Sequence, residues 1–375
     1  MVGLEACTCR LDEVREKLAR VRDFLARERL DAVWFRRADN FAWITAGGNA
    51  RVNSASTCGV ASVLVTKDAA RLVTSRVEVD RIFGEELAPH GVDSEFEPLV
   101  HEWWDDPTHV VEAAVGPETL MAVDRGHMAA SLAELRTPLT RWEAQRYPEI
   151  GAGVSGVVEE ICFGLVPGCA EREVAGRLWG ELVAAGFAPT VVLVGADERM
   201  LRYRHQVPTG AKVRRACMVV VCASQGGLTV ALTRTVSFGR PEVGLARAHG
   251  AAAAVFAAMA AACRHGASYA GVWDAAVAEY AAQGWPGQWE SHHQGGPISY
   301  GDREFLLDPR CEGRPQIAAP TAMAFNPSVP GGKSEDTFLV TEEGRLPVTV
   351  SLPEWPQSSF NRDGLEIFRP DVLVL

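Results

Sequence analysis

The feature that most constrains the fold is a change in the spacing of apolar residues near residue 137. Before it, short apolar runs such as residues 31–35 and 59–66 alternate with amphipathic stretches, which predicts an α/β layer. After it, two amphipathic helices are followed by longer segments of strand-like pattern. Pro138 interrupts a helical stretch at the change. The sequence therefore predicts an N-terminal domain over residues 1–136 and a C-terminal domain over 137–375.

The second domain is expected to be α+β, with helices outside one curved and mostly antiparallel sheet. Its clearest element is a hairpin, because two apolar runs are joined at Gly226-Gly227. The other expected elements, in chain order, are helices near 150–161 and 174–182, a strand over 190–195, a long helical section over 243–282, and strands over 315–325, 335–341 and 346–351.

Length and charge exclude several classes of protein. At 375 residues the chain is long enough for two cores, since a single core rarely grows beyond about 250 residues. The formal charge is 37 − 48 = −11 without a basic run, which disfavours partners such as nucleic acid or an anionic membrane.

The pattern of cysteines and apolar residues predicts a cytoplasmic protein. The nine cysteines show no Cys-x-x-Cys spacing, which favours a reducing compartment. The first residues lack the apolar region of a signal peptide. The longest apolar run, residues 250–263, is shorter than the roughly 20 residues of a membrane span.

Residues 151–156 match the G-x-G-x-x-G motif of dinucleotide sites. Such a site needs the glycine loop directly after a buried strand, and here a polar segment comes before it. We therefore predict no dinucleotide cofactor.

Four segments of the second half occur in the order and approximate spacing of a known family. They are residues 195–210, 226–239, 292–304 and 324–344, and FAWITAGG at 41–48 adds a match in the first half. On these segments the chain resembles the creatinase and Xaa-Pro aminopeptidase superfamily. The resemblance implies the pita-bread fold, with an α/β N-terminal domain and an α+β pita-bread C-terminal domain, and it implies a homodimer.

In metallopeptidase members of that family, two Asp, one His and two Glu hold two divalent ions. Such a pair needs anionic oxygen ligands. The resemblance places these positions near Cys222 and on Ala231, Gly296, Asn326 and Glu335. Only one carboxylate remains, so we predict that the chain holds no dimetal centre and no other cofactor.

A site for a single metal ion is also disfavoured. His292, His293 and Glu304 are the candidate ligands, but neighbouring residues on a strand point to opposite faces.

The remaining polar residues resemble the metal-free branch that includes creatinase. His205 matches the histidine that transfers a proton there, and Arg303 and Glu304 match an Arg-Glu pair whose Arg suits a substrate carboxylate. Purely structural roles, as a bonded loop histidine and an internal ion pair, stay open for these residues. The two glutamates that would bind a guanidinium group fall on Thr233 and Asn326, so creatine hydrolysis is not expected.

Our leading hypothesis is a metal-independent hydrolase that acts on a C–N bond of a small amide, peptide-like or amidine-like metabolite. His205 would move a proton between water and the leaving nitrogen, and Glu304 or Glu335 would orient it. The other residues expected at the substrate site are Arg303, Asn326, Tyr300, Arg204, Cys222, His293 and, from the first domain, Arg51. For Cys222, in the run MVVVC, a buried structural thiol is the favoured interpretation.

Two other functions remain open. One is a non-hydrolytic tailoring enzyme that uses the same pocket for elimination or cyclisation. The other is a catalytically inactive module that binds a peptide or a protein.

Overall fold

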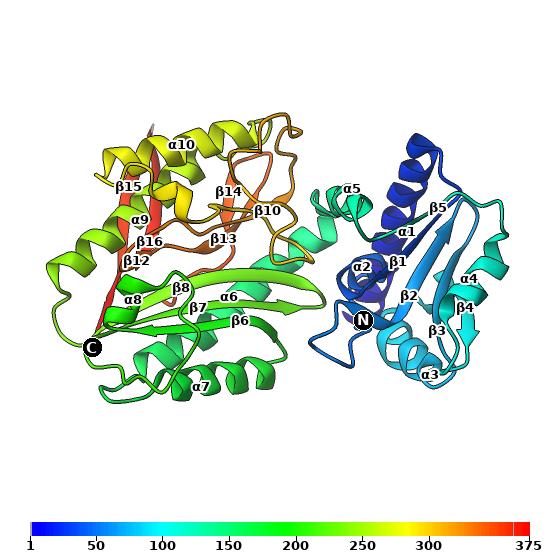
Figure 1. Ribbon diagram of the computed structural model, residues 1–375, viewed down its shortest axis with the longest axis horizontal. Helices are drawn as coiled ribbons and strands as arrows, with labels where there is room; N and C mark the ends of the chain where they lie inside the picture. Colours follow the sequence, from blue (N-terminus) through cyan, green and yellow to red (C-terminus); the bar gives the residue numbers. More distant parts are fainter. Residues whose placement is uncertain (1, 363) are drawn as a thin grey trace. The chain divides into compact units, whose positions relative to one another are not determined.

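The structure is a computed structural model that describes residues 2–362 and 364–375, with side chains from Arg10 onward. The chain forms two compact units (Figure 1). Unit 1 contains the residues up to Trp142 together with Gly226–Leu228, and unit 2 contains Glu143–Gln225 and Thr229–Leu375. The boundary that the sequence predicts lies between helix α5 (His127–Arg136) and helix α6 (Arg141–Phe163).

Unit 1 is built on a mixed five-stranded sheet with the order β4-β3-β2-β1-β5. Strand β1 pairs antiparallel with β2 and parallel with β5. Helix α1 contributes buried Val14, Leu18 and Val21, the stripe that the helical spacing predicts. The elements besides α5 are α1 (Val2–Glu28), β1 (Ala32–Arg37), α2 (Ala38–Ile44), β2 (Cys58–Thr66), β3 (Ala70–Ser75), α3 (Val79–Arg81), η1 (Ile82–Leu87), η2 (Ala88–His90), η3 (Asp93–Glu95), β4 (Glu97–His101), α4 (Pro107–Val115) and β5 (Met121–Val123).

Unit 2 has two four-stranded sheets, with the orders β14-β13-β10-β9 and β17-β8-β7-β6, where one curved sheet was expected. Helix α7 packs on β6, and α9 packs on β12 and β16. The two sheets are joined where Thr233 N donates to Glu335 O at 2.9 Å. The first elements besides α6 are α7 (Glu171–Ala184), β6 (Ala188–Ala196), α8 (Glu198–Arg202), β7 (Ala216–Gln225), β8 (Leu228–Ser237), α9 (Val243–Ala262), α10 (Tyr269–Ala282), η4 (Gln288–Ser291) and β9 (Gly295–Pro297). The last are β10 (Thr321–Phe325), β11 (Ser328–Val329), β12 (Gly332–Lys333), β13 (Asp336–Val340), β14 (Arg345–Pro347), β15 (Gln357–Arg362), β16 (Leu365–Pro370) and β17 (Leu373–Val374).

The hairpin of β7 and β8 follows from its two glycines. Gly226 and Gly227 have φ angles of 53° and 82°. A two-residue type I′ turn needs positive φ at both positions, and glycine adopts it without steric cost. The turn fixes the register in which Cys222 and Thr233 enter the site described below.

The long helical section predicted over 243–282 consists of two helices, α9 and α10. By length and composition α9 would be able to cross a membrane. However, most of its apolar window is buried inside the protein, and Val255, Phe256 and Met259 belong to the core of unit 2. The helix therefore packs as a core helix of unit 2.

The G-x-G-x-x-G motif lies within helix α6 and not in a loop after a strand. A Cβ atom on Gly151 would lie only 2.2 Å from the carbonyl oxygen of Val348. The first glycine of the motif therefore allows close packing between the helix and the chain after β14.

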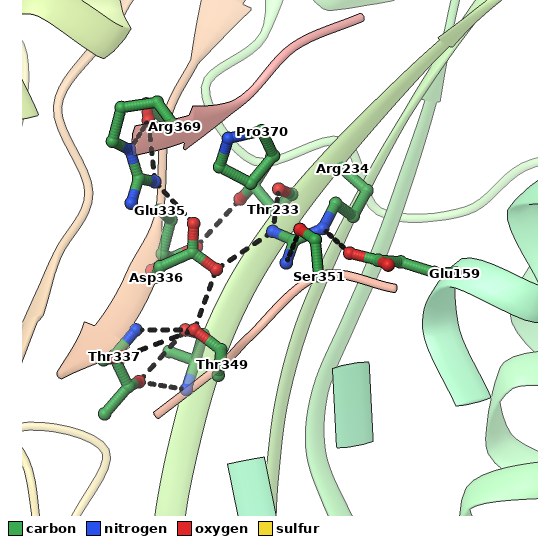
Figure 2. A network of polar contacts seen from close by, with 12 residues as sticks. Glu159, Thr233, Arg234, Glu335, Asp336, Thr337, Thr349, Ser351, Arg369 and Pro370 are labelled. Atoms are coloured by element: carbon green, nitrogen blue, oxygen red, sulfur yellow. Dashed lines mark hydrogen bonds and ion pairs between the residues drawn. The ribbon is translucent and has the colours of Figure 1, made fainter. Parts of the chain in front are cut away.

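A buried polar network holds strand β13 in place (Figure 2). Arg234 of β8 donates to Asp336 Oδ1 at 2.9 Å and also bonds Glu159 of α6. Arg369 of β16 bonds the other oxygen of Asp336. Successive residues of an extended chain point to opposite faces, so these contacts direct Glu335, the residue before Asp336, to the other side. The network thus positions Glu335 through contacts made by its neighbour Asp336.

Candidate active site

The carboxylate of Glu335 is the centre of a buried cluster in unit 2. Its Oε2 accepts hydrogen bonds from Lys333 Nζ at 2.6 Å and Thr233 Oγ1 at 2.9 Å, and its Oε1 accepts one from Arg303 Nη2 at 3.1 Å. The side chains of Glu335, Lys333 and Arg303 are only 3%, 5% and 8% exposed. Burial by itself would raise the pKa of Glu335, but Lys333 and Arg303 lower that pKa to about 2. Glu335 is therefore an ionised acceptor at neutral pH.

Lys333 is the site residue that the sequence analysis missed. Burial lowers its pKa to about 8, although Glu335 acts in the opposite direction. A signal was present in the sequence, because residues two apart in an extended segment share one face and Lys333 is two residues before Glu335.

Three histidines gather beside this cluster. The rings of His205 and His292 are 4.9 Å apart between centroids, and those of His292 and His293 are 4.0 Å apart. The sequence analysis expected the two adjacent histidines to point to opposite faces of a strand. They precede β9 and are not part of a strand, and their rings lie side by side. The carbonyl oxygen of His293 lies 2.9 Å from Nδ1 of His292.

All three imidazoles favour the neutral form. Burial and then Arg204 lower the pKa of His292 to about 4, and burial and then His292 lower the pKa of His293 to about 3. Partial burial, Arg204 and Lys333 also lower the pKa of His205. A neutral imidazole can accept a proton at neutral pH. Since His205 is the one exposed residue of the three, it is placed to exchange a proton with water.

Arg204 connects the histidines to the segment after β10. Its Nη2 donates to Asn326 O at 3.1 Å and lies 3.4 Å from Nδ1 of His292. Its Nε is buried without a hydrogen-bond partner in the described protein, and so is Oδ1 of Asn326. Buried polar atoms are normally bonded, so these two atoms indicate a place for a ligand.

A cavity of about 180 Å³ opens beside the cluster in unit 2, and both Arg204 and Lys333 line it. Its apolar lining residues are Met200, Leu201, Met218, Val329 and Pro330. The cavity therefore presents two cationic side chains and an apolar wall to a small molecule.

Glu304 has a different position from the one expected for a catalytic carboxylate. Its Oε1 accepts bonds from Ser299 Oγ, from the backbone N–H of Tyr300 at 3.1 Å and from that of Gly301 at 3.0 Å. These contacts close the loop that carries Arg303. They favour a positioning role for Glu304, and they make Tyr300 part of the same loop.

The contacts of Cys222 support the structural interpretation. The thiol is buried on β7, and burial, together with Glu335, raises its pKa to about 12. A neutral thiol is a poor nucleophile. Arg51 belongs to unit 1, where its side chain is exposed, and a role for it in the site stays a prediction.

The residues of the cluster do not fit a dinuclear metal centre. Both oxygens of Glu335 are bonded by cationic side chains. Ala231 carries no donor atom, and a Cβ on Gly296 would lie 2.2 Å from the carbonyl oxygen of Phe305, so no ligating side chain fits there. Within the part of the chain that the structure describes, no group of three or more His, Cys, Asp or Glu has the arrangement of a metal site.

Fold and site together define a pita-bread protein whose central carboxylate is held by side-chain cations. The model of metallopeptidase family M24 matches residues 146–342, just over half of the chain, and the protein belongs to this family. The superfamily resemblance of the sequence motifs is thereby confirmed. A comparison with curated protein sequences gave no match.

Solved structures confirm the predicted fold. Dipeptidase PepE from Mycobacterium ulcerans is 20% identical with a TM-score of 0.73, over 97% of this chain and 98% of that one. The Xaa-Pro dipeptidase from Bacillus anthracis is 17% identical with a TM-score of 0.68, over 96% and 100%. The N-terminal domain of FACT complex subunit SPT16 from Cicer arietinum is 10% identical with a TM-score of 0.64, over 92% and 96%. At these identities the likeness is one of fold.

Proposed function

We propose that this chain is a hydrolase that cleaves a C–N bond of a small amide or peptide-like metabolite without a dimetal centre. The observation that carries the proposal is the pairing of Glu335 with Lys333 and Arg303. The positive charge that divalent ions would supply is here supplied by side chains fixed in a buried site. Preorganised charge of this kind stabilises an oxyanion in a transition state.

His205 is the group that we assign to proton transfer. It takes a proton from a water molecule while the water oxygen forms a bond to the carbonyl carbon, and it returns that proton to the nitrogen as the C–N bond breaks. Lys333, which lines the cavity, offers N–H donors to the carbonyl oxygen as it gains negative charge.

The test is turnover of a panel of small amides and dipeptides, with and without excess chelator. We expect the same rate in both conditions and a loss of about 10²- to 10⁴-fold in kcat for His205→Gln. His265→Gln is the matched control, because His265 is an exposed histidine outside the cluster, and it should keep full activity. Activity that chelator removes and manganese restores would overturn the proposal, and so would full activity of His205→Gln.

A second function, a binding module without catalysis, is favoured by one observation. Both oxygens of Glu335 are engaged by protein donors, so the carboxylate is not free to polarise a water molecule. This candidate predicts that peptides raise the melting temperature while no substrate of the panel is turned over. If turnover does occur, product mass separates hydrolysis, which adds a water molecule, from cyclisation or elimination.

A further inference from the structure

The charged residues that line the cavity in unit 2 are all cationic. Its charged lining residues are Arg202, Arg204 and Lys333, and no Asp or Glu is among the residues that line it. Arg202 is paired at the surface with Glu198 at 3.0 Å. Close by, Arg303 adds a further cation, and Glu335 is the carboxylate that Lys333 and Arg303 share. The three cations Arg204, Lys333 and Arg303 act on the single carboxylate of Glu335, and the excess of positive charge would be neutralised by an anionic ligand.

Four buried polar atoms of the cavity wall and the neighbouring cluster lack a hydrogen-bond partner in the described protein, and of their residues Arg204 and Gln206 line the cavity. Two are donors, Nε of Arg204 and Nε of Arg303, and two are acceptors, Oε1 of Gln206 and Oδ1 of Asn326. Gln206 and Asn326 are only 3% and 5% exposed, so bulk water does not satisfy them. A ligand that completes the set must offer both acceptor oxygens and an N–H donor.

The rest of the cavity wall is apolar. Met200 and Met218 belong to one buried apolar cluster, and Leu201 and Val329 add to the same wall. Methionine side chains adapt to ligands of different shape. The wall therefore suits an aliphatic group next to the charged end.

We propose that the cavity binds an N-acylated amino acid with an apolar side chain, that is, an amide with a free carboxylate and no ammonium group. The carboxylate meets Arg204, the amide N–H meets Oε1 of Gln206, and the side chain lies on the methionine wall, while Lys333 faces the amide carbonyl oxygen. A zwitterionic dipeptide fits this cavity less well, because its ammonium group would face cations and no carboxylate is among the lining residues. This inference deepens the proposed function and rests on it for the position of the scissile bond.

Isothermal titration calorimetry on the full chain tests the ligand class with three probes. N-acetyl-leucine carries the carboxylate and the amide, N-acetyl-leucinamide lacks the carboxylate, and leucine has an ammonium group instead of the amide. We expect N-acetyl-leucine to bind at least about tenfold more tightly than either of the others, since a hydrogen bond to a charged group is worth a factor of this size.

Variants locate the binding in this cavity. Arg204→Met should weaken the binding of N-acetyl-leucine by about tenfold or more. Arg172→Met is the matched control, because Arg172 is exposed on α7, and it should leave the affinity unchanged. Equal affinities for the three probes, tighter binding of leucine, or no effect of Arg204→Met would overturn the inference.

Binding and turnover separate the two proposals. If N-acetyl-leucine binds as expected while no amide is cleaved, the ligand class holds and the proposed hydrolase function fails. If dipeptides are cleaved independently of metal while N-acetyl-leucine does not bind, the hydrolase function holds and the ligand class fails.

Discussion

Replacing Lys333 by Met tests the electrostatic basis of the site. The change removes the 2.6 Å contact with Glu335 Oε2 and leaves that buried carboxylate to Thr233 and Arg303. Removing one partner of a buried ion pair costs about 3–5 kcal/mol, because the other charge is left without compensation. Lys333→Met should therefore lower the free energy of unfolding by about 3 kcal/mol.

The two pKa values of the pair indicate how its parts balance. The pKa of Glu335 falls from 4.5 to about 2, a change worth about 3 kcal/mol in favour of the folded protein. The pKa of Lys333 falls from 10.5 to about 8, which is an opposing cost of similar size due to burial. The two contributions oppose each other, so the pair as a whole has little net effect on stability, whereas removing one partner is costly.

This balance makes a double-mutant cycle informative. Lys333→Met and Glu335→Gln should each destabilise the protein, while the double variant should cost at least about 2 kcal/mol less than their sum. Equilibrium urea unfolding followed by circular dichroism measures these values, with separate transitions fitted if the two units unfold in turn. Lys212→Met is the control, since Lys212 forms an exposed pair with Glu173 at 3.6 Å and its loss should leave the stability unchanged.

The free energy of unfolding should also depend on pH in a way that reports on this ion pair. The folded pKa of Glu335 lies below its ordinary value, so its contribution to stability is complete above pH 4.5 and is lost as the pH falls toward 2. In Lys333→Met the pKa of Glu335 should rise, and the loss should begin at a higher pH. Additive effects in the cycle, or an unfolding curve of Lys333→Met that matches Lys212→Met, would refute the reasoning.

Three further predictions concern single groups. Because its pKa is lowered, His205 should give kcat/KM an acid limb centred below pH 6.5, and this limb should be missing in the residual activity of His205→Gln. Buried Cys222, with a pKa raised to about 12, should resist iodoacetamide at pH 8 in the folded protein, whereas exposed Cys58 should be alkylated, as peptide mass analysis would show. Asp336→Asn should lower the free energy of unfolding by about 3–5 kcal/mol in urea, because it leaves Arg234 without one of its buried acidic partners.

The local parts of the fold were predictable because their causes are local. The double glycine at Gly226-Gly227 fixes a hairpin by backbone sterics alone, and the stripe of Val14 and Leu18 fixes a helix by its spacing. The break between α9 and α10 was missed, because both helices are apolar and their shared burial hides the boundary. The division of the predicted sheet into two was also beyond the sequence, since it depends on which distant strands pair.

For the candidate site, too, the sequence predicted one part of the chemistry and the tertiary structure was needed for the other. The family resemblance places metal-ligand positions on Ala231 and Asn326, and the neutral residues there already argue against a dimetal centre. Only the tertiary structure shows that Glu304 closes its own loop and that Lys333 bonds Glu335. Charge compensation acts over a few ångströms between segments far apart in the chain, so the fold, and not sequence spacing, decides which charges meet.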